Sequence, residues 1–560
     1  MTELARPSRT RRALARVAML LPSRADYAGT GRTWRGDLVA GLTVGIVALP
    51  LALGFGISSG LSAEAGLVTA IIAGLLAAIF GGSHVQVSGP TGAMVVVLAP
   101  IVVNHGVGAV ATVTLMAGAI VLAAGALRLG RAVSFIPWPV IEGFTLGIAI
   151  IIFLQQVPQV TTGAPATDHS TNAVIAAIES LGSADPVYLL WALGAAAIVA
   201  ACMLLAPRIH QAIPGSLLGI IVVTVLVLVL PTPLATIGEL PSSLPVPALP
   251  TIDPAVLPDL VMPAVTVAAL AAIESLLSAR VASSLAEVGG YDPDRELVGQ
   301  GVASLGAALF GGMPATGAIA RTAVNVRAGG GSRIASAFHA VVLLGVVLVA
   351  AGPVGQIPLA ALAGVLMVTA VRMVHHDTAR AILRSTRADA LAFLLTAVVT
   401  VAFDLIVAVV IGVAFAGVIA LRSLSGASRI HREPVAGDAQ PGDEGIAILR
   451  IDGPLLFTSA DRVVDEMSGV AGVTVVILRM SGLELVDATG ARSLGDIVHA
   501  LERRGITVLI KGVQPRHEDL FRTVGVLGSL RHHKHLFSDL DAAVGHARSH
   551  IRRERDAQTA

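Results

Sequence analysis

The sequence of 560 residues has little charge, almost no lysine and one cysteine. That cysteine, Cys202, excludes an intrachain disulfide and a cysteine-ligated metal cluster. Charged residues make up 13% of the chain, whereas soluble proteins carry roughly a quarter. The only two lysines, Lys511 and Lys534, lie in the last fifth of the chain. We therefore expect most of the chain to lie in lipid, and the net charge of +1 does not indicate nucleic-acid binding.

Long stretches contain no lysine or arginine, namely residues 36–127, 132–207 and 209–279. A membrane-spanning helix needs about 20 apolar residues, so each stretch can hold several spans. Apolar runs bounded by glycine, proline or charge predict about fourteen spans. They lie near 38–56, 65–82, 91–103, 109–127, 135–157, 187–206, 214–230, 262–286, 297–311, 317–327, 334–352, 358–374, 388–403 and 405–421. The third and tenth are too short to cross the hydrocarbon core as helices.

Arginines at alternate span ends predict the orientation of the chain. They follow the fourth, sixth, tenth, twelfth and last spans, at Arg128, Arg131, Arg208, Arg327, Arg333, Arg372, Arg380, Arg384, Arg387, Arg422 and Arg429. The opposite loops, 157–187 and 231–261, contain acidic residues but no lysine or arginine. This distribution favours a multi-pass protein of the cell membrane with both termini in the cytoplasm.

Composition divides the chain into four parts. Residues 1–35 are predicted to form a basic cytoplasmic tail, because no cleavage pattern follows their short apolar stretch. Residues 36–425 form the membrane domain, and 426–444 a linker. Residues 445–550 are predicted to form a small α/β domain, with strands at 446–451, 473–479 and 507–511 and a helix at 488–503.

The membrane domain contains an internal repeat, with halves at about 36–231 and 255–425. Ala77–Gly82 (A-A-I-F-G-G) recurs as Ala307–Gly312 (A-A-L-F-G-G), and a T-G-A triplet follows each, at Thr91–Ala93 and Thr316–Ala318. The gap between the two parts differs by five residues. Because the copies lie seven spans apart, an odd number, the second must run in inverted topology. Inverted repeats with interrupted helices are typical of secondary transporters, whose substrate site lies between the broken helices.

Glycine and proline around both triplets disfavour a continuous helix. We expect an extended approach at 88–94 and 314–322, followed each time by a helix that starts inside the membrane. The first turn of such a helix has unpaired N–H groups and a positive dipole end. Two such ends facing each other would bind an anion. The alternative is that the glycines only allow close helix packing.

Five charged residues lie within or beside predicted spans: Glu142, Glu274, Arg280, Arg321 and Asp404. Such residues are costly in lipid and are candidates for function. Glu274 lies mid-span with Ser278 one turn later, where a carboxylate could take up a proton or a cation. Arg321 either supplies positive charge to the anion or neutralises Glu274. The other three are expected at span ends or an outer turn, and His84 and Gln86 in a loop.

Several motifs resemble the SulP family of inorganic anion transporters with a C-terminal STAS domain. They are G-D-L-V-A-G-L-T-V-G-I-V-A-L-P-L-A-L-G-F-G (36–56), S-G-P-T-G-A-M (88–94), I-E-S-L-L-S (273–278), R-E-L-V-G-Q-G (295–301) and A-T-G-A-I-A-R-T-A-V-N-V (315–326). The resemblance implies a polytopic α-helical membrane protein of seven plus seven inverted spans. It also implies core and gate domains, elevator-like movement, a homodimer, and substrates such as sulfate, bicarbonate, chloride or dicarboxylates.

The resemblance also implies roles for particular residues. The third-span substrate contact would be Thr91, with Gly92 and Ala93 following it in the triplet. The tenth-span backbone facing the anion would be Gly317, Ala318, Ile319 and Ala320, next to Arg321. The eighth-span carboxylate that holds the coupling ion would be Glu274, with Ser278 beside it.

Four positions depart from the sodium-coupled bicarbonate branch of that family. In that branch the residue at the Glu274 position looks like an Asp, and a Thr stands at the Ser278 position. A Thr also stands at the Ile319 position, and no arginine stands at the Arg321 position. Glu274 and Arg321 thus favour proton coupling or exchange over sodium, with sulfate as the first expected substrate. The first-span A-L-P-L-A-L-G-F-G, however, resembles the bicarbonate branch, so bicarbonate and dicarboxylates stay alternatives.

In the C-terminal domain, V-D-A-T-G (486–490) resembles the STAS signature. The serine phosphorylated in soluble relatives would stand at Ala488, which favours a docking or dimer role over phosphorylation unless Thr489 substitutes. A membrane-anchored STAS signalling protein and a uracil or purine permease are the competing hypotheses. The first gives no reason for charges inside the membrane, and the second would not be expected to carry a STAS domain. The sequence has no metal-ligand spacing, nucleophile motif or phosphate loop, so neither an enzyme nor a cofactor is expected.

Overall fold

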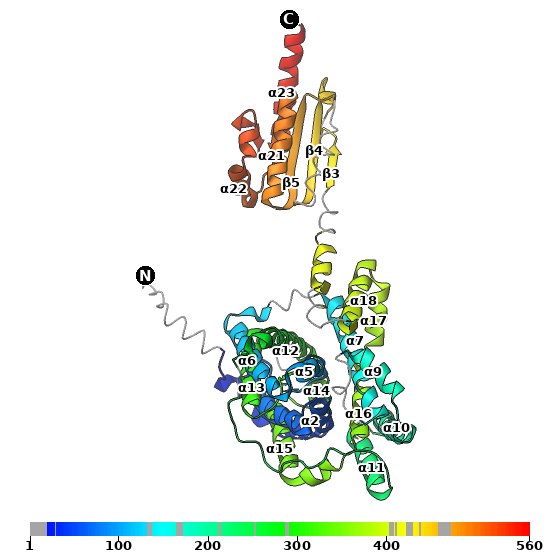
Figure 1. The fold of residues 1–560 in the computed structure, drawn as a ribbon. Coiled ribbons are helices and arrows are strands. Elements are labelled where there is room, and N and C mark those ends of the chain that lie inside the picture. The colour runs from blue at the N-terminus through cyan, green and yellow to red at the C-terminus, as the bar shows by residue number, and fades with distance from the viewer. Residues whose placement is uncertain are drawn as a thin grey trace, which may run out of the picture. The chain divides into compact units, whose positions relative to one another are not determined.

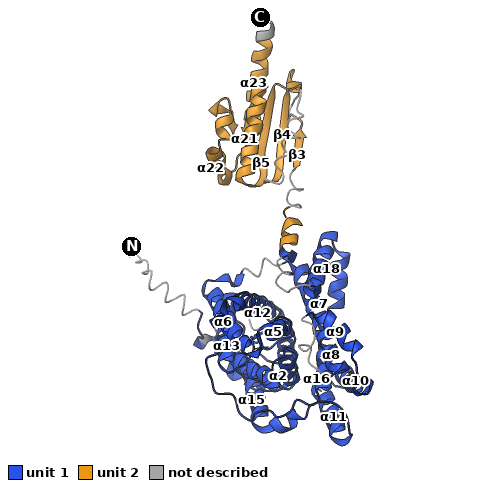
Figure 2. Cartoon of the chain, in the orientation of Figure 1, with its two compact units in different colours: residues 1–413 blue, residues 414–560 orange. Residues whose placement is uncertain are grey.

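The computed structural model describes residues 20–27, 30–131, 137–163, 172–210, 214–250, 254–285, 290–402, 408, 411–419, 421, 429–435, 438–456 and 472–559. The chain divides into two compact units, residues 1–413 and residues 414–560 (Figure 2). The boundary lies within the predicted fourteenth span, of which residues 405–407, 409–410 and 420 are outside the described ranges.

The first unit consists almost entirely of helices (Figure 1). They are α2 (Thr30–Ser58), α3 (Ala63–Val68), α4 (Gly74–Phe80), α5 (Gly92–His105), α6 (Val107–Ala126), α7 (Trp138–Gln155), α8 (Val157–Thr161), α9 (Ala173–Gly182), α10 (Pro186–Ile209), α11 (Gly215–Val229), α12 (Leu257–Leu285), α13 (Pro293–Leu309), α14 (Ile319–Arg327), α15 (Arg333–Gly355), α16 (Leu359–Met373), α17 (His376–Arg384) and α18 (Arg387–Ala402). A π-helical turn, η2 (Thr69–Ala73), joins α3 to α4.

Each of the first thirteen predicted spans contains a helix. In the described part of the chain, eight helices are long and apolar enough to cross a membrane, and α5, α9 and α11 are shorter apolar helices. The count of fourteen spans therefore stays a prediction. Helices α9 and α17 lie in segments predicted to be loops. The start of α9 has a sequence signal, because the side chain of Asn172 accepts hydrogen bonds from the N–H groups of Val174 and Ile175.

Helix packing in the first unit follows the internal repeat. Helix α12 is the counterpart of α2 in the second half, and α15 is the counterpart of α6. Helix α2 packs on α15, and α12 packs on α6 in the same way. Likewise α4 packs on α15 and α13 on α6, while α10 packs on α16 and α18 on α7. Each contact in one pair is thus repeated between the corresponding helices of the other half, as an inverted repeat requires.

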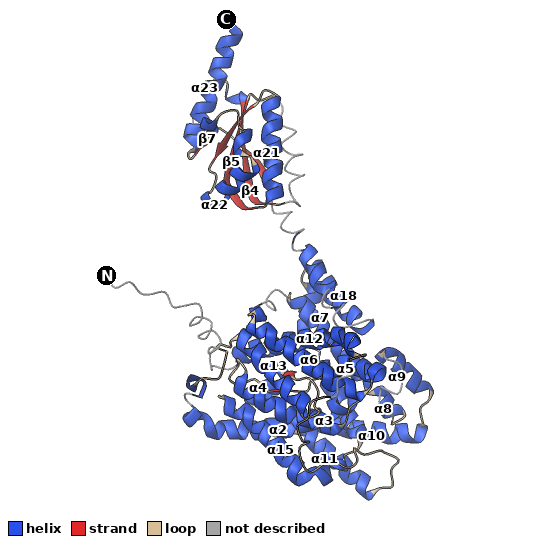
Figure 3. Cartoon of the chain, turned by 60° about the vertical axis from the view of Figure 1, so that its left-hand side comes forward, coloured by secondary structure: helices blue, strands red, loops and turns tan. Residues whose placement is uncertain are grey.

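The helices of the first unit form two groups. One group contains α2, α5, α6, α12, α13, α14 and α15, and the other contains α7, α9, α10, α11, α16, α17 and α18 (Figure 1). Contacts of α2 with α11 and α16, and of α5 with α7, join the groups. Both triplet segments lie in the first group. There β1 (Ser88–Gly89) and β2 (Thr316–Gly317) pair as antiparallel strands, with Ser88 opposite Gly317 and Gly89 opposite Thr316 (Figure 3, red).

The second unit contains a five-stranded sheet in the order β3-β4-β5-β6-β7. Its strands are β3 (Arg429–Glu433), β4 (Ile446–Leu455), β5 (Val475–Val486), β6 (Thr507–Lys511) and β7 (Leu536–Phe537). Only β3 is antiparallel to its neighbour. The predicted strands and the helix at 488–503 are confirmed. Strand β3, by contrast, lies in the segment predicted to be a linker. Its polar sequence R-I-H-R-E is that of an exposed edge strand and lacks the apolar alternation by which strands are predicted.

Alternating side chains along the central strands divide between two cores. Ala447, Leu449 and Ile451 of β4 face the core formed with α21 (Ala488–Arg503) and α22 (Pro515–Val524). Ile446 and Ile448 face the opposite core, formed with α23 (Leu540–Thr559). This period of two is the one expected for a sheet covered on both faces. The second unit therefore has a core of its own.

A buried carboxylate joins the first helix of the first unit to the second half of the chain. Asp37, on α2, is fully buried and accepts hydrogen bonds from the N–H groups of Gly331 and Ser332, at 2.8 and 3.0 Å, and from Ser332 Oγ at 2.6 Å. Ser332 is itself the N-cap of α15. The carboxylate thus fixes the start of α15 against α2.

Replacement of Asp37 by alanine is expected to destabilise the first unit. The substitution leaves buried donors without an acceptor, at a cost of about 1–3 kcal/mol. We expect a lower apparent midpoint of thermal unfolding in detergent. Glu239→Ala, at an exposed carboxylate in the same unit, is the control and should leave the midpoint unchanged. Equal midpoints for the two variants would contradict a structural role for Asp37.

Candidate functional site

The threonines of the two triplets meet at one carboxylate. Thr91 Oγ1 and Thr316 Oγ1 each donate a hydrogen bond of 2.8 Å to Oε2 of Glu274, on α12. The two hydroxyl oxygens lie 3.1 Å apart. Both threonines are buried, whereas Glu274 is partly exposed. The carboxylate is therefore held by two hydroxyl groups, one from each triplet.

Two helices start at this junction, α5 at Gly92 and α14 at Ile319. Thr91 is the N-cap of α5, but its hydroxyl bonds to Glu274 and caps no N–H group of the helix. Ala318, the N-cap of α14, has no side-chain group that could do so. The first N–H groups of a helix have no intrahelical partner, so both helix starts present positive ends without a capping side chain.

The two triplets are not structurally equivalent, although their letters match. Thr91 is the N-cap of α5, whereas Thr316 belongs to strand β2, two residues before the N-cap Ala318. The structural counterpart of Thr91 is thus Ala318. As a result Thr316 reaches Glu274 from a strand and Thr91 from a helix start. The two T-G-A triplets therefore place the site between the two halves of the repeat, but their threonines reach Glu274 from different structural positions.

Arg321, in the first turn of α14, extends its side chain to the first copy of the repeat. Its Nη2 donates a 2.5 Å hydrogen bond to the carbonyl oxygen of Pro90, and its Nη1 finds no hydrogen-bond partner among the described residues. A Cβ built on Gly89 would lie 2.7 Å from Nη1, so a glycine at this position leaves room for the guanidinium. The side chain is almost fully buried, and no ion pair joins it to Glu274 within the described residues. Arg321 therefore makes no direct ion pair with Glu274, although the two charges are near enough to attract each other.

Residues around strand β2 fix the second triplet. The N–H of Gly317 donates a 3.0 Å hydrogen bond to Ser275 Oγ, and Gln86 Nε2 donates one of 3.3 Å to the carbonyl oxygen of Ser275. A Cβ on Gly317 would overlap the Gln86 amide. Glycine is therefore required here for close approach of the backbone. Ser275 and Gln86 together position β2 against α12, the helix that carries Glu274.

In each half of the chain, the loop that follows the second span is hydrogen-bonded to a side chain of the other half. Glu296, on α13, accepts hydrogen bonds from the N–H groups of Gly82 and Ser83 in the first half, at 2.8 and 3.1 Å. Thr69, in η2, accepts a 2.7 Å bond from the N–H of Met313 in the second half. These reciprocal bonds lie just before β1 and β2. They explain why two distant segments come together as paired strands.

The structure brings most of the predicted site residues together and separates a few. Gly92, Ala93, Gly317 and Ala318 are buried at the two helix starts, whereas Ile319 and Ala320 are exposed on the first turn of α14. Ser278 is buried, and its Oγ lies 3.4 Å from Thr322 Oγ1 and not within hydrogen-bond distance of Glu274.

The remaining charged residues lie elsewhere. Glu142 is paired with the exposed His375 at 3.5 Å, and Arg280 is exposed. His84 is half-buried in the loop before β1. Asp404 lies outside the described residues. Among the described residues, neither Glu142 nor His84 forms a hydrogen bond or ion pair with Thr91, Thr316 or Glu274.

Sequence reasoning missed three polar contributors to this junction. Thr316 was not among the predicted site residues, although it is the first letter of the second triplet. Ser275 directly follows Glu274, and a position one residue along a helix normally faces another direction. Gln86 was assigned to a loop, and that loop is buried. Only Thr316 carried a usable signal, the repeat itself.

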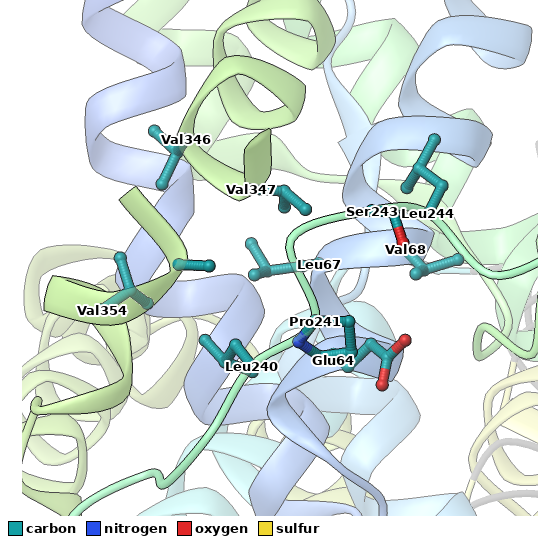
Figure 4. A pocket seen from close by; sticks show the side chains of 11 residues that line it. Glu64, Leu67, Val68, Leu240, Pro241, Ser243, Leu244, Val346, Val347 and Val354 are labelled. Atoms are coloured by element: carbon teal, nitrogen blue, oxygen red, sulfur yellow. The ribbon is translucent and has the colours of Figure 1, made fainter. Parts of the chain in front are cut away.

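Several cavities border the described helices without containing the junction. A small apolar pocket lies between α3, α15 and the segment 240–244, and the Glu64 carboxylate on its wall points away from Leu67 and Leu240 (Figure 4). A larger cavity of about 250 Å³ lies between α5, α7, α12 and α18 and is lined by Thr266, among others. Thr266 precedes Glu274 by eight residues, about 12 Å along the helix. Its lining also includes Asn104 and His105, so it lies beside the C-terminal end of α5 and away from the helix start at Gly92.

In the second unit, the V-D-A-T-G segment starts helix α21. Asp487 is the N-cap and accepts a 2.7 Å hydrogen bond from the N–H of Gly490. Ala488 is the first residue of the helix, and Thr489 is exposed beside it. The signature therefore forms a capped helix start with one exposed hydroxyl.

Comparisons with known proteins agree with these features. The model of the sulfate permease family matches residues 34–396, and that of the STAS domain matches residues 440–543. The chain is 36% identical to the "Putative sulfate transporter YvdB" of Bacillus subtilis (strain 168), over 91% of this chain and 97% of the relative. It is 30% identical to the "Bicarbonate transporter BicA" of Picosynechococcus sp. (strain ATCC 27264 / PCC 7002 / PR-6), over 83% of this chain and 86% of the relative.

Among solved structures, that of SLC26A9 superposes with a TM-score of 0.83 at 18% identity, and the match covers 98% of this chain and 96% of that one. At this identity the likeness concerns the fold alone. The family model, in contrast, covers more than half of the chain, and it matches the part that contains both triplets and Glu274. The chain therefore belongs to the sulfate permease family and is a multi-pass membrane transporter of anions with a C-terminal STAS domain.

Proposed function

We propose that the protein is a secondary active transporter that takes up sulfate together with protons. The observation that carries the proposal is the Glu274 carboxylate, held by two threonine hydroxyls between two helix starts. The anion would bind at those helix starts, through the backbone at Thr91–Ala93 and Gly317–Ala320, with the Arg321 guanidinium close by. Glu274 would carry the coupling proton, and Ser278 would support the same helix face.

The charges at the junction explain why an anion and a proton would bind together. Arg321 and ionised Glu274 carry opposite unit charges, so they sum to zero near the helix starts. Protonation of Glu274 leaves a net charge of +1, added to about +0.5 from each helix end. A dianion such as sulfate then binds more tightly. By reciprocity, bound sulfate favours the protonated carboxyl group, which is the thermodynamic basis of symport.

The threonine hydroxyls suit a group that changes its protonation state. A hydroxyl can donate a hydrogen bond to the ionised carboxylate and can accept one from the protonated carboxyl group. Backbone N–H groups could only donate. Thr91 and Thr316 can therefore satisfy the Glu274 side chain in both protonation states.

The two helix groups support an elevator-like movement. The junction, including Arg321, lies entirely within the group that contains α2, α5, α12 and α14, and only a few helix contacts join this group to the other. We propose that this group moves as a body against the second one and carries the anion with it. The arginine-rich span ends support cytoplasmic termini in the cell membrane, and the proposal includes a homodimer, as in the family resemblance.

Bicarbonate is the second candidate, because a 30% identical relative is named a bicarbonate transporter. The two substrates differ in charge, and Arg321 together with a protonated Glu274 favours the dianion. Sodium is the alternative coupling ion, since the carboxylate and hydroxyl oxygens of the junction are also the oxygen ligands that hard cations prefer.

Uptake into proteoliposomes tests this proposal. Radiolabelled sulfate, bicarbonate and a dicarboxylate are compared, each under an inward proton gradient, an inward sodium gradient and no gradient. We expect sulfate to accumulate under the proton gradient alone, and a protonophore to abolish the accumulation. Accumulation of bicarbonate without sulfate would overturn the substrate, and accumulation driven by sodium alone would overturn the coupling ion.

A further inference from the structure

Three histidines in the second unit place their ring nitrogens close together. His535, His546 and His550, called here the histidine cluster, each offer a nitrogen within 4.8 Å of the others. The Nε2 atoms of His546 and His550 lie 3.3 Å apart. His535 is buried and the other two are partly buried. The cluster belongs to the second unit and shares no residue with the junction around Glu274.

The fold fixes all three positions. His546 and His550 are four residues apart on α23, so they lie on one face of that helix. Its neighbouring face, with Ala543, Val544 and Ala547, packs into the core against the sheet and sets the rotation of the helix. His535 ends the 3-10 helix η7 (His533–His535) directly before β7, and α23 contacts β7 (Figure 3). The rings thus meet where the C-terminal helix crosses the edge of the sheet.

His535 has one buried ring nitrogen without a hydrogen-bond partner among the described residues. The side chain is 4% exposed, and its Nδ1 has no hydrogen-bond partner in the described part of the domain. The ring also hydrogen-bonds to the backbone of Val508. Since Nδ1 is unpaired, that bond uses Nε2. A backbone partner on one nitrogen fixes the tautomer and leaves the other nitrogen with a free lone pair, as is usual for a histidine that ligates a metal.

Neutral imidazole is the form that ligates metals, and burial favours that form of each ring. Burial, with the neighbouring histidines, lowers the pKa of His535 to about 4. Burial also lowers the pKa of His546 and of His550, with Arg553 as a further cause for both. Of the other charged groups nearby, Arg531 is paired with Glu502 at 3.2 Å, and Arg553 donates a hydrogen bond to Ser549. His532 is exposed, and its Nδ1 accepts a bond from the N–H of Lys534.

We propose that the histidine cluster binds one zinc ion through His535, His546 and His550. Tetrahedral zinc has bonds to histidine nitrogen of about 2.0–2.1 Å, which places two such nitrogens about 3.3 Å apart. The His546–His550 separation has this value. Three imidazoles without a carboxylate favour zinc over calcium or magnesium, which prefer oxygen ligands. A fourth position is left for water or another ligand. The ion would join α23 to the sheet edge at β7.

Metal binding to the purified full-length protein, without a polyhistidine tag, tests this proposal. After treatment with a chelator, the protein is titrated with zinc by calorimetry and with cobalt by visible absorption. We expect one zinc ion per chain and the absorption bands of tetrahedral cobalt. His550→Gln, at a partly buried helix position, should weaken zinc binding by roughly tenfold or more and abolish the tetrahedral bands. His546→Gln should do the same.

The matched control is the variant His533→Gln, because His533 is exposed and lies outside the cluster. This variant should bind zinc as tightly as the unmodified chain does. The proposal is overturned if zinc binds the His550→Gln and His546→Gln variants as tightly as the unmodified chain. It is equally overturned if the unmodified chain takes up no zinc or gives only octahedral cobalt spectra. A far-ultraviolet circular dichroism spectrum that matches the unmodified chain shows that a variant is folded.

Discussion

Replacement of Glu274 by glutamine is expected to abolish proton-driven sulfate uptake while leaving sulfate binding intact. Glutamine is neutral and close in size to a protonated glutamate, so it mimics the state in which the junction has its net charge of +1. Its amide can still bond to the Thr91 and Thr316 hydroxyls, because these groups donate and accept. The variant cannot release a proton. Gradient-driven accumulation should therefore fall to background, a loss on the order of 100-fold or about 2.7 kcal/mol of coupling free energy.

The measurement has two parts, uptake into proteoliposomes and equilibrium binding of sulfate at several pH values. The unmodified chain should bind sulfate more tightly as the pH falls, and the Glu274→Gln variant should bind it equally at every pH. Glu142→Gln is the matched control, because that carboxylate lies on α7, pairs with an exposed histidine and should have no effect. Unchanged pH dependence of transport in the Glu274→Gln variant would rule out Glu274 as the proton carrier.

The sequence predicts the position of this junction better than its contacts. The repeat of A-A-(Ile/Leu)-F-G-G and T-G-A indicates which segments meet, because a duplicated and inverted unit places its two copies at a common axis. The structure then pairs them as β1 and β2. The different roles of Thr91 and Thr316 could not be predicted, since they depend on where each helix starts. In the first copy the helix N-cap lies nine residues after the second glycine of F-G-G, and in the second copy it lies six residues after it. The two spacings therefore differ by three residues.

Contacts of a side chain with the backbone of the other half of the repeat could not be predicted from the sequence, for a related reason. The side chain of Arg321 reaches Pro90, about 230 positions away in the chain, and Glu296 reaches Gly82 over a similar separation. No local pattern records such a partner. The amphipathic helix at 488–503 is the opposite case, because the spacing of its apolar residues and its capping Asp487 are both local signals. Its predicted bounds agree with α21.

The second large effect is expected from Arg321. Its buried guanidinium has one amino group bonded to Pro90 and one without a recorded partner, so it can offer a charge-assisted hydrogen bond to an oxyanion that enters between the helix starts. Removal of such a bond costs about 1.5–3 kcal/mol, so Arg321→Ala should weaken sulfate binding about 10- to 100-fold. Arg327→Ala, at an exposed arginine on the same helix, is the control and should bind sulfate normally.

A double substitution separates the two roles considered for Arg321. If the arginine binds the anion itself, Arg321→Ala weakens sulfate binding to a similar extent in the Glu274→Gln background, because glutamine needs no counter-charge. If the arginine serves only to balance Glu274, the same background restores the affinity. The interaction free energy from this cycle, measured by equilibrium binding, should be small compared with the loss in the single Arg321→Ala variant. Arg321→Lys keeps the charge but not the planar fork of donors, and its affinity should fall between those of arginine and alanine. Full recovery of binding in the double variant would assign the arginine to Glu274, and the positive charge that attracts the anion would then come from the two helix ends alone.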